Sequence, residues 1–461
     1  MNRLCLIAAV VSLVFLFSLV LIPFAQADWI MFRSDVSHSG VGTGNPVLTS
    51  NPTLAPTLLW KFTTGGSIFS SPAVVGGVVY IGSEDYLIYA LNASNGAQLW
   101  TFHTSDRVES SPAVVGGVVY VGSEDGNVYA LNAINGAKLW SYTTGGGVYS
   151  SPTVVGGVVY VGSEDNNVYA LNAATGALVW ECTTYAYGGG VYSSPAVVGG
   201  VVYFGANLAG TGLVYALDAA TGVQLWNFST SDWIYSSPTV VGSVVYVGSD
   251  DHHVYALNSA SGTQLWSFTT SDQVGSSPAV VGGVVYVGSN DGNVYALDAS
   301  SGAKIWSYPI KNGEVDSSPA VVSGVVYVGG WDYEVHALNA SSGAQLWNYP
   351  ISDGWVESSP AVVGGVVYVG STDGNVYALG SSSTSSSPNP LSSASPNAGS
   401  SSQGASNLVT VIFADLMRPW FIILVVVIVV VLIVSALLRR RKSKPQTMPN
   451  WVSTPPPSPS N

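Results

Sequence analysis

Residues 118–131, "VVYVGSEDGNVYAL", are the most informative stretch of this sequence, because near copies of it recur along the chain. The copies begin at residues 158 ("VVYVGSEDNNVYAL"), 284 ("VVYVGSNDGNVYAL") and 366 ("VVYVGSTDGNVYAL"). Each consists of two apolar runs separated by an acidic turn, a pattern typical of a β-hairpin. The dipeptide Asp125-Gly126 favours a type I′ turn, since both central residues of that turn need positive φ.

The hairpin is part of a longer repeat with a period close to 40 residues. A tryptophan closes each unit, with spacings of 40, 40, 40, 46, 40, 40 and 41 residues, and the tripeptide Ser-Ser-Pro also occurs eight times. The tryptophans are Trp60, Trp100, Trp140, Trp180, Trp226, Trp266, Trp306 and Trp347. A period near 40 with strand and turn chemistry is the signature of a β-propeller or a solenoid.

Each unit predicts four strands, named A to D in chain order. In one unit these are residues 111–115, 118–123, 127–133 and 137–144. Strand B is apolar throughout rather than alternating, so both faces of its sheet should be buried, as in radially packed blades. The chain begins the repeats with a lone D strand at Trp60 and ends them with an A–B–C set at Leu379. We therefore predict an all-β, eight-bladed β-propeller of four-stranded blades, closed by the Trp60 strand.

The two ends of the chain predict export and membrane anchoring. Residues 1–27 have a basic start, an apolar middle and "AQA" before Asp28, which is typical of a signal peptide, with an uncleaved anchor helix as the alternative. The apolar run 420–438 is long enough for a transmembrane α-helix, and the basic stretch 439–444 follows it. By the positive-inside rule, we expect a single-pass type I protein of the cell membrane, with an extracellular propeller and a cytoplasmic tail.

The predicted domain organisation follows from these boundaries. It comprises a signal peptide (1–27), an N-terminal segment (28–59), the propeller (60–380), a Ser/Pro-rich stalk (381–407), a juxtamembrane segment and transmembrane helix (408–438, with the helix at 420–438) and a basic, Pro-rich tail (439–461). Only Cys182 lies beyond the signal, so no internal disulfide is expected. Asn92, Asn227 and Asn339 begin N-x-S sequons, whose use the sequence leaves open.

Acidic residues gather on one face of the predicted ring. In an up-and-down blade, the B–C turns and D–A loops share a face, and these segments hold most of the aspartates and glutamates, against Arg107 and Lys311. The opposite face has little besides residues such as Lys138, Asp298 and Lys304. An acidic face excludes nucleic acid as an expected partner. Hairpin chemistry and solubility explain the same charges without a ligand, so both interpretations stay open.

Departures from the repeat fall on the same face and supply the candidate binding residues. Residues 183–190 ("TTYAYGGG") lengthen the loop into the fourth blade, and residues 205–212 ("GANLAGTG") lengthen its B–C turn. The candidate ligand face consists of Tyr185, Tyr187, Trp233, Tyr235, Asp250, Asp251, Trp331, Asp332, Asp353 and Trp355. Aromatic rings among carboxylates suit sugar or peptide recognition, with drift between repeats as the alternative.

Two further patterns concern the channel and metal binding. The residue before each Ser-Ser-Pro differs from blade to blade, and topology places these residues around the channel mouth. The run "DDHH", residues 250–253, has metal-binding side chains, although adjacent residues of a turn rarely converge on one ion. The acidic turns have fewer ligands than a calcium loop needs. We therefore assign no metal site from the sequence.

The repeat unit, as in "VVYVGSEDGNVYALNAINGAKLW" (118–140), resembles that of the pyrroloquinoline-quinone (PQQ)-like eight-bladed propellers, and "DWIMFRSDVSHSG" (28–40) resembles the segment that precedes many of them. The resemblance implies tryptophans that lock neighbouring blades. The resemblance is compatible with several functions, because the family includes quinoprotein dehydrogenases and an outer-membrane assembly lipoprotein. The dehydrogenases hold PQQ with a vicinal disulfide and a calcium ion, and this chain lacks both the cysteine pair and the inserts that supply the calcium ligands.

The expected function is therefore non-catalytic. Near-identical blades offer few unique positions for a catalytic site, and sites rather than folds confer function. We expect a membrane-anchored, cell-surface propeller that binds an extracellular protein or glycan, or scaffolds an assembly, without a cofactor. A quinoprotein-type oxidoreductase with PQQ and calcium is the alternative, and a structural component of the cell envelope is the second.

Overall fold

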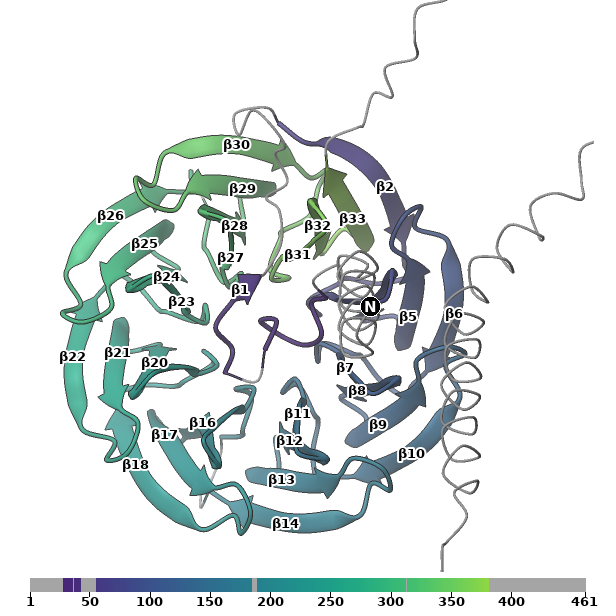
Figure 1. Ribbon diagram of the computed structural model, residues 1–461, viewed down its shortest axis with the longest axis horizontal. Helices are drawn as coiled ribbons and strands as arrows, with labels where there is room; N and C mark the ends of the chain where they lie inside the picture. Colours follow the sequence, from purple (N-terminus) through teal and green to yellow (C-terminus); the bar gives the residue numbers. More distant parts are fainter. Residues whose placement is uncertain (1–27, 36, 43–54, 185–188, 312, 381–461) are drawn as a thin grey trace, which may run out of the picture. The chain divides into compact units, whose positions relative to one another are not determined.

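Eight β-sheets surround a central axis in the computed structural model, each sheet forming one blade (Figure 1). The structure describes residues 28–35, 37–42, 55–184, 189–311 and 313–380. Seven blades are built from consecutive strands, and the eighth combines the first long strand of the chain with its last three strands. The predicted eight-bladed propeller of four-stranded blades is confirmed.

The strands of the blades follow one another in chain order. Blade 1 contains β3 (Ala73–Val75), β4 (Val78–Gly82), β5 (Leu87–Asn92) and β6 (Gln98–His103), and blade 2 contains β7 (Ala113–Val115), β8 (Val118–Gly122), β9 (Asn127–Asn132) and β10 (Lys138–Thr143). Blade 3 contains β11 (Thr153–Val155), β12 (Val158–Gly162), β13 (Asn167–Asn172) and β14 (Leu178–Thr183), and blade 4 contains β15 (Ala196–Val198), β16 (Val201–Leu208), β17 (Thr211–Asp218) and β18 (Gln224–Thr230).

The second half of the ring repeats this order and adds the two strands from the start of the chain. Blade 5 contains β19 (Thr239–Val241), β20 (Val244–Ser249), β21 (His253–Asn258) and β22 (Gln264–Thr269), and blade 6 contains β23 (Ala279–Val281), β24 (Val284–Gly288), β25 (Asn293–Asp298) and β26 (Lys304–Pro309). Blade 7 contains β27 (Ala320–Val322), β28 (Val325–Gly329), β29 (Glu334–Asn339) and β30 (Gln345–Pro350), joined by β1 (Val41–Gly42). Blade 8 contains β31 (Ala361–Val363), β32 (Val366–Gly370), β33 (Asn375–Gly380) and β2 (Thr57–Thr63).

Two kinds of tight turn join these strands, and one differs from the prediction. The pair Gly116–Gly117 between β7 and β8 has φ of 60° and 79°, so the type I′ turn lies here. In the B–C turn Gly126 has a φ of 79°, whereas Asp125 does not have positive φ. The Gly126 amide donates to the Ser123 carbonyl at 3.1 Å, giving a type I turn followed by one left-handed residue. The predicted type I′ turn at Asp125-Gly126 is therefore wrong, because three residues (124–126) rather than two separate Ser123 from Asn127, whose carbonyl accepts from the Ser123 amide at 3.1 Å.

The fourth blade also differs from its prediction. Residues 205–212 do not lengthen the B–C turn but extend the two strands, which remain paired as far as Leu208 with Thr211. Only residues 209–210 lie between the paired positions. The longer ladder pairs backbone groups that a longer loop would leave to water. The β16–β17 hairpin consequently reaches further beyond the ring than its equivalents.

Tryptophans of the outer strands connect neighbouring blades. In blade 1, the Trp100 indole Nε1 donates to the carbonyl of Ala133 in blade 2 at 3.0 Å. The same indole covers Gly136, where a Cβ would lie 2.6 Å from the ring, so only glycine fits beneath it. Trp60 of β2 makes the corresponding bond to the Ala93 carbonyl at 2.9 Å. The shared blade 8 therefore contacts blade 1 as blades 1 to 6 contact their successors, and Figure 1 shows β2 alongside β33.

The Ser-Ser-Pro tripeptides form a continuous hydrogen-bonded circle around the channel. The second serine of each blade donates its backbone amide to the hydroxyl of the equivalent serine in the next blade, at 2.9–3.1 Å. The series runs through Ser71, Ser111, Ser151, Ser194, Ser237, Ser277, Ser318 and Ser359 and returns to Ser71. These buried backbone amides thus find partners that strand pairing does not give them, which explains why the tripeptide recurs.

The N-terminal segment 28–42, which we call the thread, lies across the inner ends of the blades (Figure 1). Its backbone bonds to the innermost strands at Val74 in blade 1, Val114 in blade 2, Val240 in blade 5, Val280 in blade 6 and Val321 in blade 7. The buried guanidinium of Arg33 donates to the carbonyls of Ser277 and Pro278, both at 2.7 Å. The thread therefore contributes both backbone pairing and a buried charge to the centre of the ring.

Several predicted segments lie outside the described residues. These are the signal peptide 1–27, the stalk 381–407, the juxtamembrane segment and helix within 408–438, and the tail 439–461. Among the residues that the structure describes, no helix has the length and apolar character needed to cross a membrane.

Candidate functional site

The eight residues that precede the Ser-Ser-Pro tripeptides line one cavity at the mouth of the channel. Its volume is about 260 Å³, and Phe32 of the thread is also part of its lining. The eight residues are Phe69, Glu109, Tyr149, Tyr192, Tyr235, Gly275, Asp316 and Glu357. Each blade supplies one residue at the same position, so differences between otherwise similar repeats determine the chemistry of this cavity.

Three tyrosines from consecutive blades form an aromatic arc along one side of the cavity. The ring centroids of Tyr149 and Tyr192 are 5.4 Å apart, and those of Tyr192 and Tyr235 are 5.5 Å apart. The Tyr192 hydroxyl donates to Glu164 Oε1 at 2.9 Å, which orients the central ring. The arc therefore presents a series of electron-rich aromatic surfaces, which attract cations as well as apolar groups.

Three carboxyl groups occupy other positions of the same ring, and burial raises the pKa of each. The pKa of Glu109 is raised to about 8, chiefly by loss of water and next by repulsion from Glu124 and Glu84. Burial and then neighbouring carboxylates raise the pKa of Glu357 to about 7 and that of Asp316 to about 6. We call these three residues the acidic arc. A cation placed between the two arcs would favour the ionised carboxylates and meet the tyrosine rings.

A recess adjoins the cavity at Gly275, the position of the ring without a side chain. It has a volume of about 340 Å³ and also includes Asp250, Gln273 and Asn290. Asp250 is 8% exposed, and burial, followed by repulsion from Asp232, raises its pKa to about 7. The predicted site residue Asp250 thus lies beside the acidic arc rather than at an exposed turn.

Two of the predicted tryptophans stack on each other. Trp331 of blade 7 and Trp355, from the loop into blade 8, have ring centroids 4.5 Å apart and an interplanar angle of 10°. Trp355 is 39% exposed, and Trp331 also lines a recess of about 310 Å³ with Glu314. Asp353 is exposed in the same loop and has a φ of 61°. The stack is an aromatic surface on the acidic face, separate from the aromatic arc.

Of the other predicted aromatic residues, the structure describes Trp233 but not Tyr185 or Tyr187. Trp233 packs edge-on against Tyr235 with centroids 5.9 Å apart, and its indole Nε1 donates to the Leu208 carbonyl at 2.8 Å. It therefore supports both the aromatic arc and the extended hairpin of blade 4. Tyr185 and Tyr187 lie outside the described residues.

The hairpin aspartates accept hydrogen bonds from other groups of the protein. Asp251 Oδ2 accepts from the Tyr255 hydroxyl at 2.7 Å and from the Ser231 amide of the preceding blade's loop at 3.0 Å. Asp125 makes the same two kinds of contact in blade 2. These carboxylates connect neighbouring blades, so the interpretation as hairpin chemistry applies to them. In blade 7 the equivalent Asp332 instead contacts His336, whose Nε2 lies 3.0 Å from Asp332 Oδ2.

The "DDHH" run does not bring its side chains to one point. Asp250 lies at the recess beside Gly275, whereas His253 Nδ1 is 3.3 Å from Asp251 Oδ1. His252 Nε2 is 3.9 Å from Asp272 Oδ1, on another loop. The residues diverge because consecutive side chains of a turn point in different directions.

Sequence reasoning did not select the acidic arc or the pair Glu334 and His336 as site residues. The residues of the acidic arc are among the varying positions before Ser-Ser-Pro. Their raised pKa values come from burial, and the sequence does not reveal burial. The signal for His336 is clearer, because the other seven blades have tyrosine at this position. That departure was readable from an alignment of the repeats with one another.

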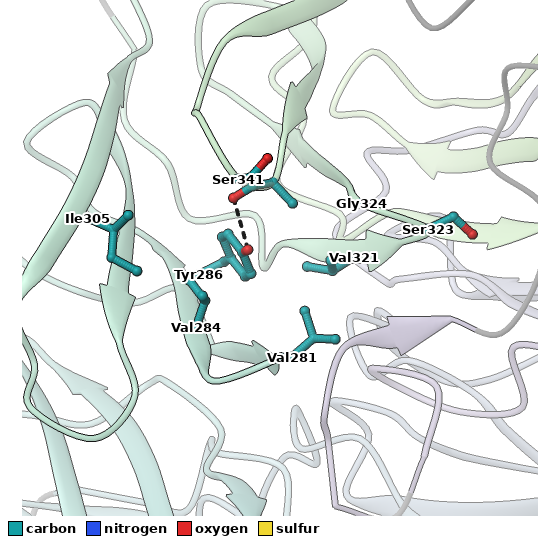
Figure 2. Close-up of a pocket in the computed structure, with 10 residues that line it drawn as sticks. Val281, Val284, Tyr286, Ile305, Val321, Ser323, Gly324 and Ser341 are labelled. Atoms are coloured by element: carbon teal, nitrogen blue, oxygen red, sulfur yellow. Dashed lines mark hydrogen bonds between the residues drawn. The ribbon is translucent and has the colours of Figure 1, made fainter.

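A hollow of about 500 Å³ lies between blades 6 and 7 beside the A–B turns, on the opposite face (Figure 2). Val281, Val284, Ile305 and Val321 line it, and the Tyr286 hydroxyl at its wall donates to the Ala340 carbonyl at 3.0 Å. None of its lining residues is charged. Its chemistry is therefore apolar, in contrast to the channel mouth.

The fold is that of a PQQ-like eight-bladed β-propeller. The chain belongs to the family described as outer membrane protein assembly factor BamB, whose repeat profile matches residues 40–146, 103–207, 184–318 and 311–416. No curated protein sequence matches the chain.

Solved structures share the architecture at low sequence identity. BamB from Moraxella catarrhalis is 20% identical, with a TM-score of 0.60, covering 70% of this chain and 99% of that one. The quinohemoprotein alcohol dehydrogenase from Comamonas testosteroni is 16% identical, with a TM-score of 0.65, covering 82% and 83%. The computationally designed protein Ika8 is 19% identical, with a TM-score of 0.61, covering 69% and 97%. An assembly factor, an oxidoreductase and a designed protein thus share this fold, so the fold leaves the enzymatic status open.

Proposed function

We propose that this protein is a non-catalytic binding module at the cell surface, anchored by the helix at 420–438, and that its channel mouth takes a cationic segment of an extracellular protein. One observation carries the proposal: the aromatic arc and the acidic arc line the same cavity. A lysine or arginine side chain entering there would meet tyrosine faces on one side and carboxyl groups on the other. The membership of a family described as an assembly factor agrees with a protein partner.

The raised pKa values make this binding dependent on pH. In the free protein, the carboxyl of Glu109, with its pKa of about 8, holds its proton at neutral pH. An incoming cation favours the ionised form, so protons leave as the ligand binds. We therefore expect affinity for a cationic ligand to rise between pH 6 and pH 8. A neutral glycan would lack this dependence, which separates the two kinds of ligand.

The test is titration of the purified full-length protein with oligo-arginine, oligo-glutamate and an array of neutral glycans. We expect binding of oligo-arginine alone, weakened at least about tenfold (about 1.4 kcal/mol) by the double variant Asp316→Asn/Glu357→Gln. Tyr192→Ala should weaken it similarly, through loss of cation–π contact. Asp298→Asn is the matched control, because it alters a carboxylate on the opposite face and introduces the residue that other blades have there. Binding that survives the double variant, or fails in the control, would refute the proposal.

The quinoprotein alternative fits the residues less well. PQQ carries three carboxylates, whereas the channel mouth of this chain presents Glu109, Asp316 and Glu357. The nearby guanidinium of Arg107 is paired with Glu84 at 3.2 Å and half exposed. Asp316, with its pKa of about 6, is ionised at neutral pH and repels a trianion, and the sequence has no vicinal cysteines. With PQQ and calcium added, we expect neither the absorbance of a bound quinone nor reduction of a dye by alcohols.

A further inference from the structure

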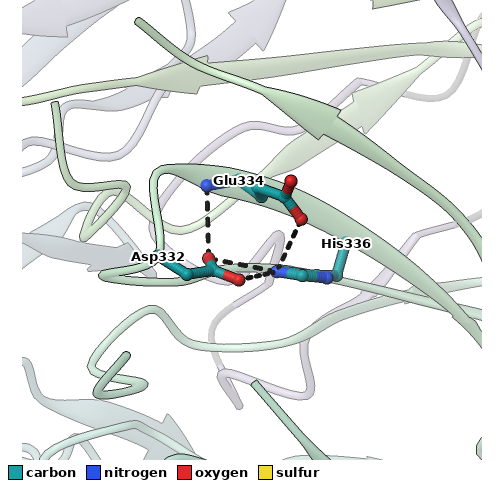
Figure 3. A group of neighbouring side chains, drawn as sticks. All are labelled: Asp332, Glu334 and His336. Atoms are coloured by element: carbon teal, nitrogen blue, oxygen red, sulfur yellow. Dashed lines mark hydrogen bonds and ion pairs between the residues drawn. The ribbon is translucent and has the colours of Figure 1, made fainter. Parts of the chain in front are cut away.

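We propose that blade 7 contains a binding site for a divalent transition-metal ion, Zn²⁺ in the first instance, formed by Asp332, Glu334 and His336. The three side chains come from one hairpin: Asp332 lies in the B–C turn, and Glu334 and His336 lie two residues apart on β29 (Figure 3). Residues i and i+2 of a strand share a face, so both point to the aspartate. One potential ligand atom of each lies within 4.8 Å of the others. This site is distinct from the channel mouth and does not depend on the proposed function.

The ligand atoms are already near the separations that a bound ion requires. A tetrahedral zinc ion with bonds of about 2.0–2.1 Å holds its ligand atoms about 3.3–3.4 Å apart. His336 Nε2 lies 3.0 Å from Asp332 Oδ2 and 4.0 Å from Glu334 Oε2, values on either side of that separation. All three potential ligand atoms lie within 4.8 Å of one another, so side-chain shifts of about 1 Å would complete three of the four bonds. The fourth position would be open to water or to a donor from a bound partner.

Comparison with the other blades separates this cluster from ordinary hairpin chemistry. In six blades the hairpin aspartate accepts a hydrogen bond from a tyrosine hydroxyl at 2.5–2.7 Å. In blade 7 histidine replaces that tyrosine, and glutamate replaces the asparagine found at this position in blades 2, 3, 6 and 8. If His336 only replaced the hydrogen bond that the tyrosine makes to the aspartate, the change from asparagine to glutamate at position 334 would not be needed. The two changes together instead add two metal-binding side chains beside the retained aspartate.

The charge of the cluster also calls for a cation. Asp332 and Glu334 bring two carboxyl groups to one nearly buried histidine, with side-chain exposures of 11%, 28% and 3%. Within the described part of the chain, the ion pairs give neither carboxylate a lysine or arginine partner. Paired carboxylates in a partly buried site are costly unless a cation or a proton compensates them. A divalent ion would meet this requirement.

The surroundings of the site affect the expected affinity. The amide Nδ2 of Asn348, directly opposite His336 on β30, donates to Glu334 Oε2 and so positions this carboxylate. The Tyr308 ring packs 6.0 Å from the imidazole of His336. His336 Nδ1, however, is buried without a partner, so the ring lacks the second hydrogen bond that usually orients a metal-bound histidine. We therefore expect an affinity about 10- to 100-fold weaker than that of a site with complete outer contacts.

The experiment measures Zn²⁺ binding to full-length protein, purified without a histidine tag and treated with a chelator. We expect one equivalent per chain in competition with a chromophoric chelator, and Co²⁺ substitution should give the intense visible bands of a four-coordinate site without a thiolate charge-transfer band. The absence of that band distinguishes this site from Cys182. His336→Tyr, which restores the residue of the other blades, should abolish the equivalent, and Glu334→Asn should weaken binding at least tenfold.

Two further variants sharpen the interpretation. Asn348→Ser introduces the residue found opposite the tyrosine in blades 2, 5 and 6, and should weaken binding about 10- to 100-fold while the Co²⁺ spectrum of the saturated site remains. His253→Asn removes a histidine that contacts a hairpin aspartate without a third ligand, and should leave binding unchanged. Because His336→Tyr recreates the hairpin of the other blades, the variant should fold. Absence of Zn²⁺ binding by the parent protein, or one equivalent retained by His336→Tyr, would overturn the proposal.

Discussion

Replacing Glu109 with glutamine should make the stability of the propeller less dependent on pH. Burial raises the pKa of this carboxyl from 4.5 to about 8, so the folded protein retains a proton that the unfolded chain releases above about pH 4.5. The free energy of unfolding therefore falls as the pH rises from 4.5 to 8. At about 1.4 kcal/mol per pKa unit the change is about 5 kcal/mol, and partial solvation of the side chain reduces it to about 2–3 kcal/mol. Glutamine does not titrate, so Glu109→Gln removes this loss.

The assay is thermal unfolding of the full-length protein and its variants at pH 5 and pH 8. With an unfolding entropy of about 2.1 cal/mol/K per residue over a ring of roughly 350 residues, 2–3 kcal/mol corresponds to about 3–4 °C. The difference in Tm between the two pH values should shrink by this amount in Glu109→Gln. Glu181→Gln, on the exposed outer strand β14, is the control and should leave the difference unchanged. An equal pH dependence in Glu109→Gln and the parent would refute the argument that burial controls this carboxyl.

Four further substitutions test the packing of the ring. Arg33→Met removes a buried guanidinium from two backbone carbonyls of blade 6 and should lower the free energy of unfolding by about 2–4 kcal/mol in a denaturant titration, whereas an unchanged midpoint would contradict a stabilising role for the thread. Gly122→Ala would place a Cβ 2.3 Å from Val148 Cγ1 and should cost about 1–3 kcal/mol by the same measurement. Trp60→Ala and Trp100→Ala should each cost about 3–5 kcal/mol, and a much smaller effect at Trp60 would show that the first strand does not close the ring.

The repeat made the fold predictable, because period, turn residues and apolar strands all indicated the same four-stranded unit. Two local features were not predictable in the same way. The B–C turn takes its form from a three-residue link in which only Gly126 needs positive φ, and the dipeptide Asp125-Gly126 is compatible with either turn. The insertion at 205–212 lengthened strands because pairing satisfies backbone groups, and length alone does not distinguish a ladder from a loop.

The candidate site was harder to predict for a physical reason. Topology placed Glu109, Asp316 and Glu357 near the channel mouth, but their raised pKa values come from burial and mutual repulsion, which depend on three-dimensional neighbours. Likewise, the sequence predicts Asp251 as a residue of the candidate ligand face, whereas its carboxylate accepts hydrogen bonds from the Tyr255 hydroxyl and the Ser231 amide. A sequence shows which side chains can be charged, but not how deeply each is buried or which groups it contacts.

The thread has a consequence for the order of events during biosynthesis. The carbonyl of Gly40, near the start of the chain, accepts a hydrogen bond from the amide of Val321, which the ribosome adds roughly 280 residues later. At 5–20 residues per second, this partner emerges about 15–60 s after the thread does. For that interval the earliest segment of the propeller has no complete binding surface. The thread, which is translated first, can therefore complete its contacts only when the last blades have been made. In a chain interrupted before blade 7, the thread would lack its binding partner in that blade.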